Sequence, residues 1–237
     1  MGTNTENLDN YLDNHFIHRS NWLRAAVLGA NDGILSVASI AIGVSAAGVS
    51  RDPIVLATVA GLVAGALSMA AGEYVSVSSQ TDIEKADIER ERIELEEMPE
   101  LELLRLAEIY EQRGLKKETA LLVAKEFTAK DALAAHVRDE LGINEISQAK
   151  PMQAALASGA SFIAGGILPL IVTLFLPLES MEYTLYGSAI FFLIILGTVS
   201  ARTGGSPIGI AILRITFWGT MAMGITAFVG YLFGVNI

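Results

Sequence analysis

Long apolar segments on both sides of one polar block constrain the fold of this chain more than any other feature. The segments are residues 23–47, 53–77, 152–176, 183–201 and 207–233. Each is long enough to cross a hydrocarbon core of about 30 Å as a helix, at about 1.5 Å per residue. The sequence therefore predicts an all-α membrane protein with five transmembrane helices and a helical domain inserted between the second and third.

The expected division of the chain follows from these segments. Residues 1–22 form an N-terminal segment, 23–80 hold helices one and two, 81–150 form the insert, and 151–237 hold helices three to five. The polar first twenty residues predict no cleavable signal peptide, so the first span directs insertion. If the chain has five spans, the Lys and Arg residues of its loops lie on the same side of the membrane as the insert, except for Arg51. This bias predicts a cytoplasmic N-terminus and insert, with the C-terminus outside.

Charge and cysteine content exclude some functions. The net charge is −10, and residues 82–145 hold eighteen Asp and Glu against ten Lys and Arg. Such a surface repels nucleic acid and attracts cations. Because the chain has no cysteine, disulfides and thiolate metal sites are excluded.

The insert is expected to contain several helices. The second span continues without Pro into DIEKADIERERIELEE, which predicts one long helix that ends at Met98, before Pro99. A second helix is expected from Pro99 to Arg113, stopped by Gly114, and a third region over residues 117–141, with Thr128 and Asp131 in capping-box spacing. The residues expected to share a core are Leu101, Leu104, Ala107, Leu115, Leu122, Val123, Phe127, Leu133 and Val137.

Acidic residues in the insert recur at helical spacing. One expected face carries Glu84, Asp87, Glu91 and Glu94; Glu108 and Glu111 form a pair; His136, Asp139 and Glu140 form a third group. A solvated charged face is one interpretation, with neighbouring Lys and Arg as i,i+4 partners. The other is a loose, exchangeable site for a divalent metal. The Glu-x-x-His pairs of a di-iron oxidase are missing, because Leu133 stands three residues before His136.

Polar residues within the first two spans carry a sharper signal. Asp32 lies within the first span, where an unpaired Asp near the centre costs about 2.5–3.5 kcal/mol. Met69 and Glu73, at i and i+4, share a face of the second span. Carboxylates with a thioether favour transition metals, which predicts a cation pathway. Small residues on the second span predict close packing at a dimer interface; they are Gly61, Gly65, Ser68 and Gly72.

Four motifs give the chain a resemblance to the vacuolar iron transporter family. They are GANDGILS in the first span, SMAAGEYVSVSSQ in the second, DIEKADIERER after it and PMQAAL at the start of the third. The motifs occur in the family's order, and the resemblance covers nearly the whole chain, about residues 15–233. It implies a homodimeric five-span exporter that moves Fe²⁺, and often Mn²⁺, out of the cytosol in exchange for protons.

The resemblance also implies site residues. Asp32 and Met69 match the membrane ion pathway, with Glu73 close by. Glu91 and Glu94 match the metal-binding domain most directly, and Glu140 is chosen in the third helical region, with His136 as candidate for a place that Met holds in some members. The register on the second helix stays open among Glu100, Glu102, Glu108 and Glu111.

The expected function is a secondary antiporter for a divalent transition metal, and not an enzyme. It needs no permanent cofactor, since Fe²⁺, or Mn²⁺, Co²⁺ or Zn²⁺, is the transported and domain-bound ion. Expected partners are membrane lipid, protons and a second copy of the chain, without nucleic acid. A bacterial plasma membrane is the expected location, with a vacuolar membrane as the alternative. The rival functions are a membrane-anchored metal sensor or scaffold and a membrane ferroxidase.

Overall fold

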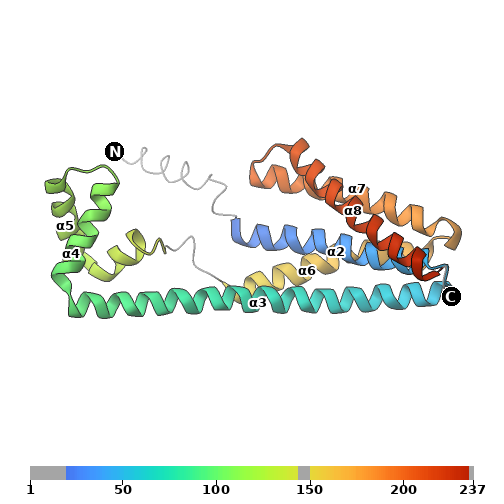
Figure 1. The fold of residues 1–237 in the computed structure, drawn as a ribbon, viewed down its shortest axis with the longest axis horizontal. Helices are drawn as coiled ribbons and strands as arrows, with labels where there is room; N and C mark the ends of the chain where they lie inside the picture. The colour runs from blue at the N-terminus through green and yellow to red at the C-terminus, as the bar shows by residue number, and fades with distance from the viewer. Residues whose placement is uncertain (1–19, 144–149, 235–237) are drawn as a thin grey trace, which may run out of the picture. The chain divides into compact units, whose positions relative to one another are not determined.

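A computed structural model describes residues 20–143 and 150–234, and every regular element in these ranges is a helix (Figure 1). In chain order the helices are α2 (Ser20–Ala46), α3 (Arg51–Glu97), α4 (Pro99–Gln112), α5 (Lys117–Asp139), α6 (Pro151–Phe175), α7 (Leu178–Gly204) and α8 (Ile208–Gly234). The chain divides into two compact units, Met1–Val75 with Pro151–Ile237, here the membrane unit, and Ser76–Lys150, here the insert unit. Helix α3 contributes residues to both.

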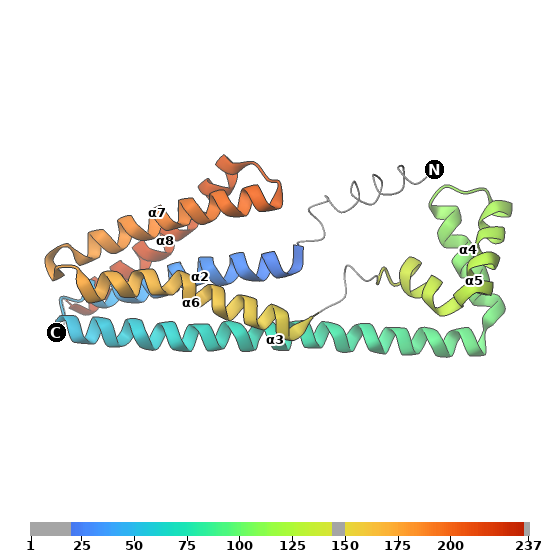
Figure 2. The same cartoon turned by 180° about the vertical axis from the view of Figure 1, so that it is seen from behind.

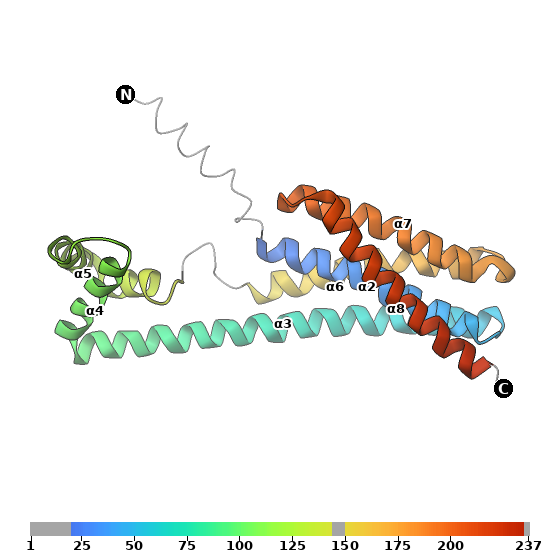
Figure 3. The same ribbon diagram turned by 45° about the horizontal axis from the view of Figure 1, so that its top comes forward.

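Five helices, α2, α3, α6, α7 and α8, are long and apolar enough to cross a membrane. In the membrane unit α6 lies alongside α2 (Figures 1 and 2), and α8 crosses α2 next to α7 (Figure 3). The prediction of an all-α protein with five membrane helices and a helical insert between the second and third is confirmed. Helix α7 begins at Leu178, directly after Pro177 and five residues before the apolar segment expected from residue 183.

Glycines bring α2 and α6 close together. A Cβ added at Gly29 would lie 2.3 Å from the carbonyl oxygen of Ser158, and one at Gly33 would lie 2.1 Å from that of Phe162. No larger side chain fits these positions without moving the backbones apart. Small residues allow such packing where lipid removes the hydrophobic drive for helix association.

Two of the α3 glycines also serve packing within the chain. A Cβ at Gly61 would lie 2.5 Å from Ile40 Cδ1, and one at Gly65 would lie 2.2 Å from Phe162 Cζ. The expectation that these two face a second subunit is therefore wrong: their missing side chains admit Ile40 of α2 and Phe162 of α6. At Gly72, by contrast, an added Cβ would meet nothing within 4 Å.

The outer faces of the membrane unit are apolar. On α8, Leu213, Trp218 and Phe228 are 68%, 63% and 61% exposed. A soluble protein rarely exposes so many large apolar side chains on one element. In a bilayer the same side chains contact lipid, which agrees with the length and hydropathy of the helix.

The insert unit takes its shape from helix breakers. Proline at position 99 ends α3 and begins α4, and Gly114, at φ +102°, closes α4 in the left-handed region that glycine favours. Its core lies between α4 and α5 and is made of Leu106, Ala107, Tyr110, Ala120, Ala124 and Ala135. Of the predicted core, Ala107 is buried and Val123 and Phe127 pack against it, but Leu101, Leu104, Leu115 and Leu122 are exposed, so their assignment is wrong.

Candidate metal centre

Four ionisable side chains from three helices converge in the insert unit. Glu91 comes from α3, Glu102 from α4 and His136 from α5, and Glu140 is the C-cap of α5. One ligand atom from each lies within 4.8 Å of the others. Glu91, Glu102 and His136 are buried, at 4%, 1% and 0% exposure. We call these four residues the Glu/His cluster.

Local structure explains why these side chains meet. The break at Pro99 folds the chain back, so Glu91, near the end of α3, and Glu102, in the first turn of α4, can face the same space. A second break at Asp131 has extended backbone, with φ −166°, and its carboxylate accepts a hydrogen bond from the amide of Ala134. Asp131 is thus the N-cap of the second half of α5. The capping-box spacing had instead predicted Thr128 as the N-cap. That half carries His136 and Glu140 four residues apart on one face.

The cluster concentrates negative charge around one imidazole nitrogen. Nδ1 of His136 lies 2.8 Å from Glu91 Oε1, 3.0 Å from Glu140 Oε2 and 3.9 Å from Glu102 Oε2. Since Nδ1 carries one proton at most, it can serve only one carboxylate well. Within the cluster, Glu102 Oε2 and His136 Nε2 are buried with no hydrogen-bond partner among the described residues, and buried Glu91 Oε1 has only its close contact with Nδ1, which is not aligned as a hydrogen bond.

Burial raises the pKa of Glu91, and the nearby charge of Glu140 adds to the effect. Several ionised carboxylates in so dry a space repel each other, and unpaired buried charge is costly. A bound cation would remove this cost. Buried carboxylate oxygens that lack a hydrogen bond within so close a group of ligand atoms are therefore an observation in favour of a metal site, independent of the count of acids.

The donor set fits a divalent transition metal. Oxygen ligands alone suit Mg²⁺ and Ca²⁺, whereas an imidazole nitrogen favours ions such as Fe²⁺, Co²⁺ and Zn²⁺. Ligands about 2.0–2.2 Å from an ion stand at most about 4.4 Å apart. The cluster, with a spread of up to 4.8 Å, would need only small side-chain movements to reach such a geometry.

Neighbouring groups fasten the end of α5 on which Glu140 lies. Asp139 accepts hydrogen bonds from the Tyr110 hydroxyl at 2.8 Å, from Arg113 at 2.6 Å and from Arg138 at 2.5 Å. Burial opposes ionisation of Asp139, but the hydrogen bonds from Arg138, Arg113 and Tyr110 outweigh it and lower its pKa to about 2. The predicted grouping of Asp139 with His136 and Glu140 is wrong, because its carboxylate joins α5 to α4 instead.

The other predicted ligands of the insert lie outside the cluster. Glu94 pairs with Arg90 of its own helix at 2.9 Å. Glu108 is exposed and Glu111 half-buried, and neither is part of the group of four. Glu102 is the residue of α4 that enters the cluster, which resolves the open register on that helix for this site.

The three predicted membrane residues have separate surroundings. Asp32 accepts a hydrogen bond from the Ser36 hydroxyl at 2.6 Å. Met69 packs against a small core that includes Leu62 and Phe162. Glu73 lies 3.7 Å from the guanidinium of Arg24. Their shared role in a pathway stays a prediction.

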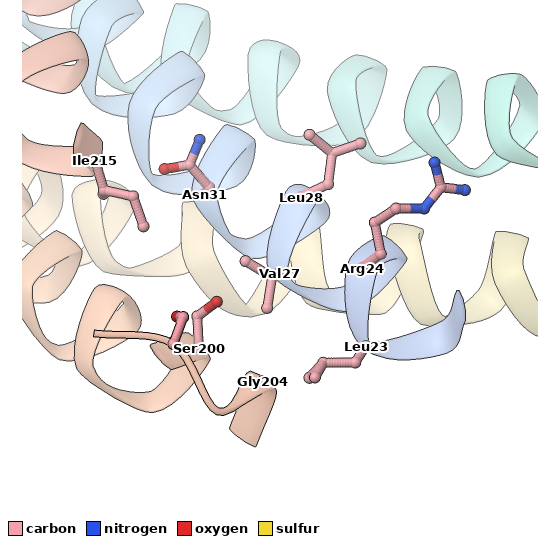
Figure 4. A pocket seen from close by; sticks show the side chains of 9 residues that line it. Leu23, Arg24, Val27, Leu28, Asn31, Ser200, Gly204 and Ile215 are labelled. Atoms are coloured by element: carbon pink, nitrogen blue, oxygen red, sulfur yellow. The ribbon is translucent and has the colours of Figure 1, made fainter. Parts of the chain in front are cut away.

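A hollow of about 450 Å³ lies between α2, α7 and α8 (Figure 4). Its wall is mostly apolar, with Val27 and Ser200 among the lining residues. The Arg24 side chain points away from Ser200 and toward α3, where Glu73 lies. Asn31 also lines the hollow, and its buried Oδ1 has no hydrogen-bond partner among the described residues. The described residues that line this hollow include no carboxylate.

Comparison with known proteins decides the family. A profile of the VIT family matches residues 23–231. The chain belongs to the VIT family. It is 47% identical over 212 residues to a vacuolar iron transporter of Acanthamoeba castellanii, covering 89% of this chain and 78% of the relative.

Plant relatives agree with this membership. Vacuolar iron transporter homolog 1 of Oryza sativa subsp. japonica is 35% identical over 223 residues, covering 94% of this chain and 78% of the relative. Vacuolar iron transporter homolog 2 of Arabidopsis thaliana is 35% identical over 209 residues, covering 88% and 82%. The resemblance read from the sequence motifs is confirmed, and with it the expectation of a transporter family in place of an enzyme.

Proposed function

We propose that this VIT-family member exports Fe²⁺, and also Mn²⁺, from the cytosol in exchange for protons. The observation that carries the proposal is the Glu/His cluster, in which three carboxylates lie around one buried imidazole. Carboxylate oxygens of Glu91 and Glu102 are buried there without a hydrogen bond. The names of the relatives support iron as the substrate. The cluster would bind the ion from the cytosol and raise its concentration near the membrane.

The sidedness and division of the chain are part of the proposal. The N-terminal segment (1–22) and the insert (81–150) lie in the cytoplasm, and residues 23–80 and 151–237 supply the five spans. The distribution of Lys and Arg supports this orientation. A bacterial plasma membrane and a vacuolar membrane both place the insert in the cytosol, where the metal is collected.

Within the membrane, Asp32, Met69 and Glu73 would replace part of the ion's hydration shell. A carboxylate at this depth is costly unless it serves a cation. Metal and proton compete for the same carboxylate lone pairs, so protons from the outer side would release the ion. Additional metal ligands of the insert, on its accessible faces, would be Glu94, Glu108 and Glu111.

The exporter is proposed to act as a homodimer. Along α3, Leu56, Val63 and Leu67 are 70%, 54% and 67% exposed and follow one face. With Gly61 and Gly65 occupied by packing inside the chain, this apolar face is the part of α3 left for a second copy or for lipid. Crosslinking between cysteines introduced at Val63 distinguishes the two.

Metal flux into proteoliposomes tests the proposal. With an acidic lumen, the wild-type protein should take up Fe²⁺ and Mn²⁺ and release protons. Asp32→Asn should abolish flux while metal binding by the Glu/His cluster is retained. Glu179→Gln, which removes an exposed acid from the first turn of α7, is the matched control and should transport normally.

Three outcomes would contradict the proposal. Wild-type flux in Asp32→Asn would remove Asp32 from the pathway. Absence of flux for every ion and gradient, with metal binding preserved, would favour a membrane-anchored metal sensor. Oxidation of Fe²⁺ without its transport would favour a ferroxidase.

A further inference from the structure

An arginine lies at the exposed edge of the Glu/His cluster. Arg105 of α4 places Nη2 2.5 Å from Glu140 Oε1, while the other oxygen of that carboxylate, Oε2, lies 3.0 Å from His136 Nδ1. The Glu140 side chain is 12% exposed, against 4% for Glu91, 2% for Glu102 and 0% for His136. The cluster is therefore most open to solvent at Glu140, the residue with which Arg105 pairs.

The rest of the structure holds Glu140 in place without Arg105. The backbone amide of Glu140 donates to the carbonyl of His136 at 2.8 Å. The neighbouring Asp139 is fixed by three donors from α4 and α5. The Arg105 side chain is itself 54% exposed, so it contributes little packing. Its main effect on the cluster is its charge.

That charge acts against a bound metal. A guanidinium on one oxygen of Glu140 leaves one oxygen for an ion, and it places a positive charge near the centre where a divalent cation would bind. In the metal-free protein the same charge offsets part of the repulsion among the carboxylates. Arg105 thus stabilises the empty cluster and weakens the loaded one.

We propose that Arg105 is the counter-ion that keeps the metal in the Glu/His cluster exchangeable. This inference rests on the proposed function, because only a site that passes its ion on needs weak and reversible binding. Ions enter and leave past Glu140, and each exchange breaks or restores the Arg105–Glu140 pair. Arg105 acts on the cluster through its charge beside Glu140 and does not bind the ion.

Metal titration of the full-length protein in detergent tests the inference, with Co²⁺ as the probe. Arg105→Gln should bind Co²⁺ about two- to fivefold more tightly than wild type, which is the range for an exposed ion pair. Release to an excess of chelator, followed by stopped flow, should slow by a similar factor. Arg105→Lys, which keeps the charge, should stay close to wild type in both measurements. A purely structural role would instead lower affinity in both variants.

A matched control separates the local effect from net charge. Arg92→Gln removes a positive charge from α3 whose ion pairs are with Glu89 and Glu96, outside the cluster, so its Co²⁺ affinity should equal that of wild type. Unchanged or weaker Co²⁺ binding by Arg105→Gln, with normal binding by the wild type, would overturn this inference and leave the proposed role of the cluster intact. Absence of Co²⁺ binding by the wild-type protein would overturn the proposed role of the cluster, and this inference with it.

Discussion

At the scale of single residues, His136 decides which ions the cluster can prefer. The remaining donors are carboxylate oxygens, which Mg²⁺, Ca²⁺ and Mn²⁺ accept as readily as Fe²⁺ does. The Nδ1 atom of His136 lies within 3.9 Å of a carboxylate oxygen of each of the three glutamates. It is therefore placed to contact the same ion as all of them.

His136→Gln should reduce affinity for Co²⁺ and Zn²⁺ by at least about tenfold. Removal of a group that only hydrogen-bonds a metal ligand already lowers metal affinity by about that factor. Mn²⁺, which tolerates oxygen donors, should lose less. Competition titrations with all three ions measure the difference. Glu118→Gln, an exposed change in the first turn of α5, is the control and should leave each affinity as it is. Equal losses for Mn²⁺ and Zn²⁺ would show that the ring only fills space.

Sequence spacing predicted part of this site. His136 and Glu140 share a helix face by their spacing of four, and Glu91 lies on the acidic face of α3. The choice of Glu102 over its neighbours on α4 could not be predicted, because it depends on how α4 turns after Pro99. Arg105 was missed for a similar reason: its partner Glu140 comes from another helix, and spacing along one helix carries no signal for such a pair.

At the scale of helices, Asp139 fastens the end of α5 to α4. Asp139→Asn should lower the free energy of opening this end by about 1–3 kcal/mol, since it weakens charged hydrogen bonds in a half-buried place. With a folded-state pKa of about 2 against an ordinary 3.8, the stabilisation is complete above about pH 4 and is lost as pH falls toward 2.

Hydrogen exchange at pH 7 measures this effect in full. Amides near the end of α5 should exchange about tenfold faster, or more, in Asp139→Asn. Glu126→Gln, an exposed change in the first half of the same helix, should leave their exchange unaltered. Unchanged protection in Asp139→Asn would mean that packing around Tyr110 alone holds the two helices.

The close approach of α2 and α6 gives a second prediction for helices. Gly33→Ala would put a methyl group 2.1 Å from the Phe162 carbonyl oxygen, so the helices must separate. Overpacking of this kind costs about 1–3 kcal/mol. Thermal unfolding in detergent should show a lower midpoint for Gly33→Ala. Gly187→Ala in α7, where an added Cβ meets nothing within 4 Å, should match or slightly exceed wild type. A stable Gly33→Ala protein would place the α2–α6 contact farther apart than described.

The insert core shows why helix packing is harder to predict than helix position. The expected core favoured the large leucines 101, 104 and 122, yet the observed contact between α4 and α5 uses Ala120, Ala124 and Ala135. Alanines let the backbones approach, so Leu106 and Tyr110 fill the space between the helices. Periodicity locates a helix, but the width of the gap it packs into depends on both partners.

At the scale of the whole molecule, hydropathy predicted the number and order of spans because each apolar run is as long as the bilayer is thick. It could not set the helix ends, since helices continue past the lipid: α3 runs to Glu97 and α7 already begins at Leu178. The number of spans has a direct consequence for sidedness. The insert lies between spans two and three, and the connection from α6 to α7 lies one span later.

The insert and the α6–α7 connection should therefore face opposite sides of the membrane. The chain has no cysteine, so a single introduced thiol reports one position without background. In bacterial cells that produce the protein, a membrane-impermeant maleimide should label Ser180→Cys in intact cells, and Lys125→Cys only after permeabilisation; both positions are exposed. The reverse pattern would place the insert outside and exclude collection of metal from the cytosol. Labelling of both in intact cells would mean that α6 does not cross the membrane.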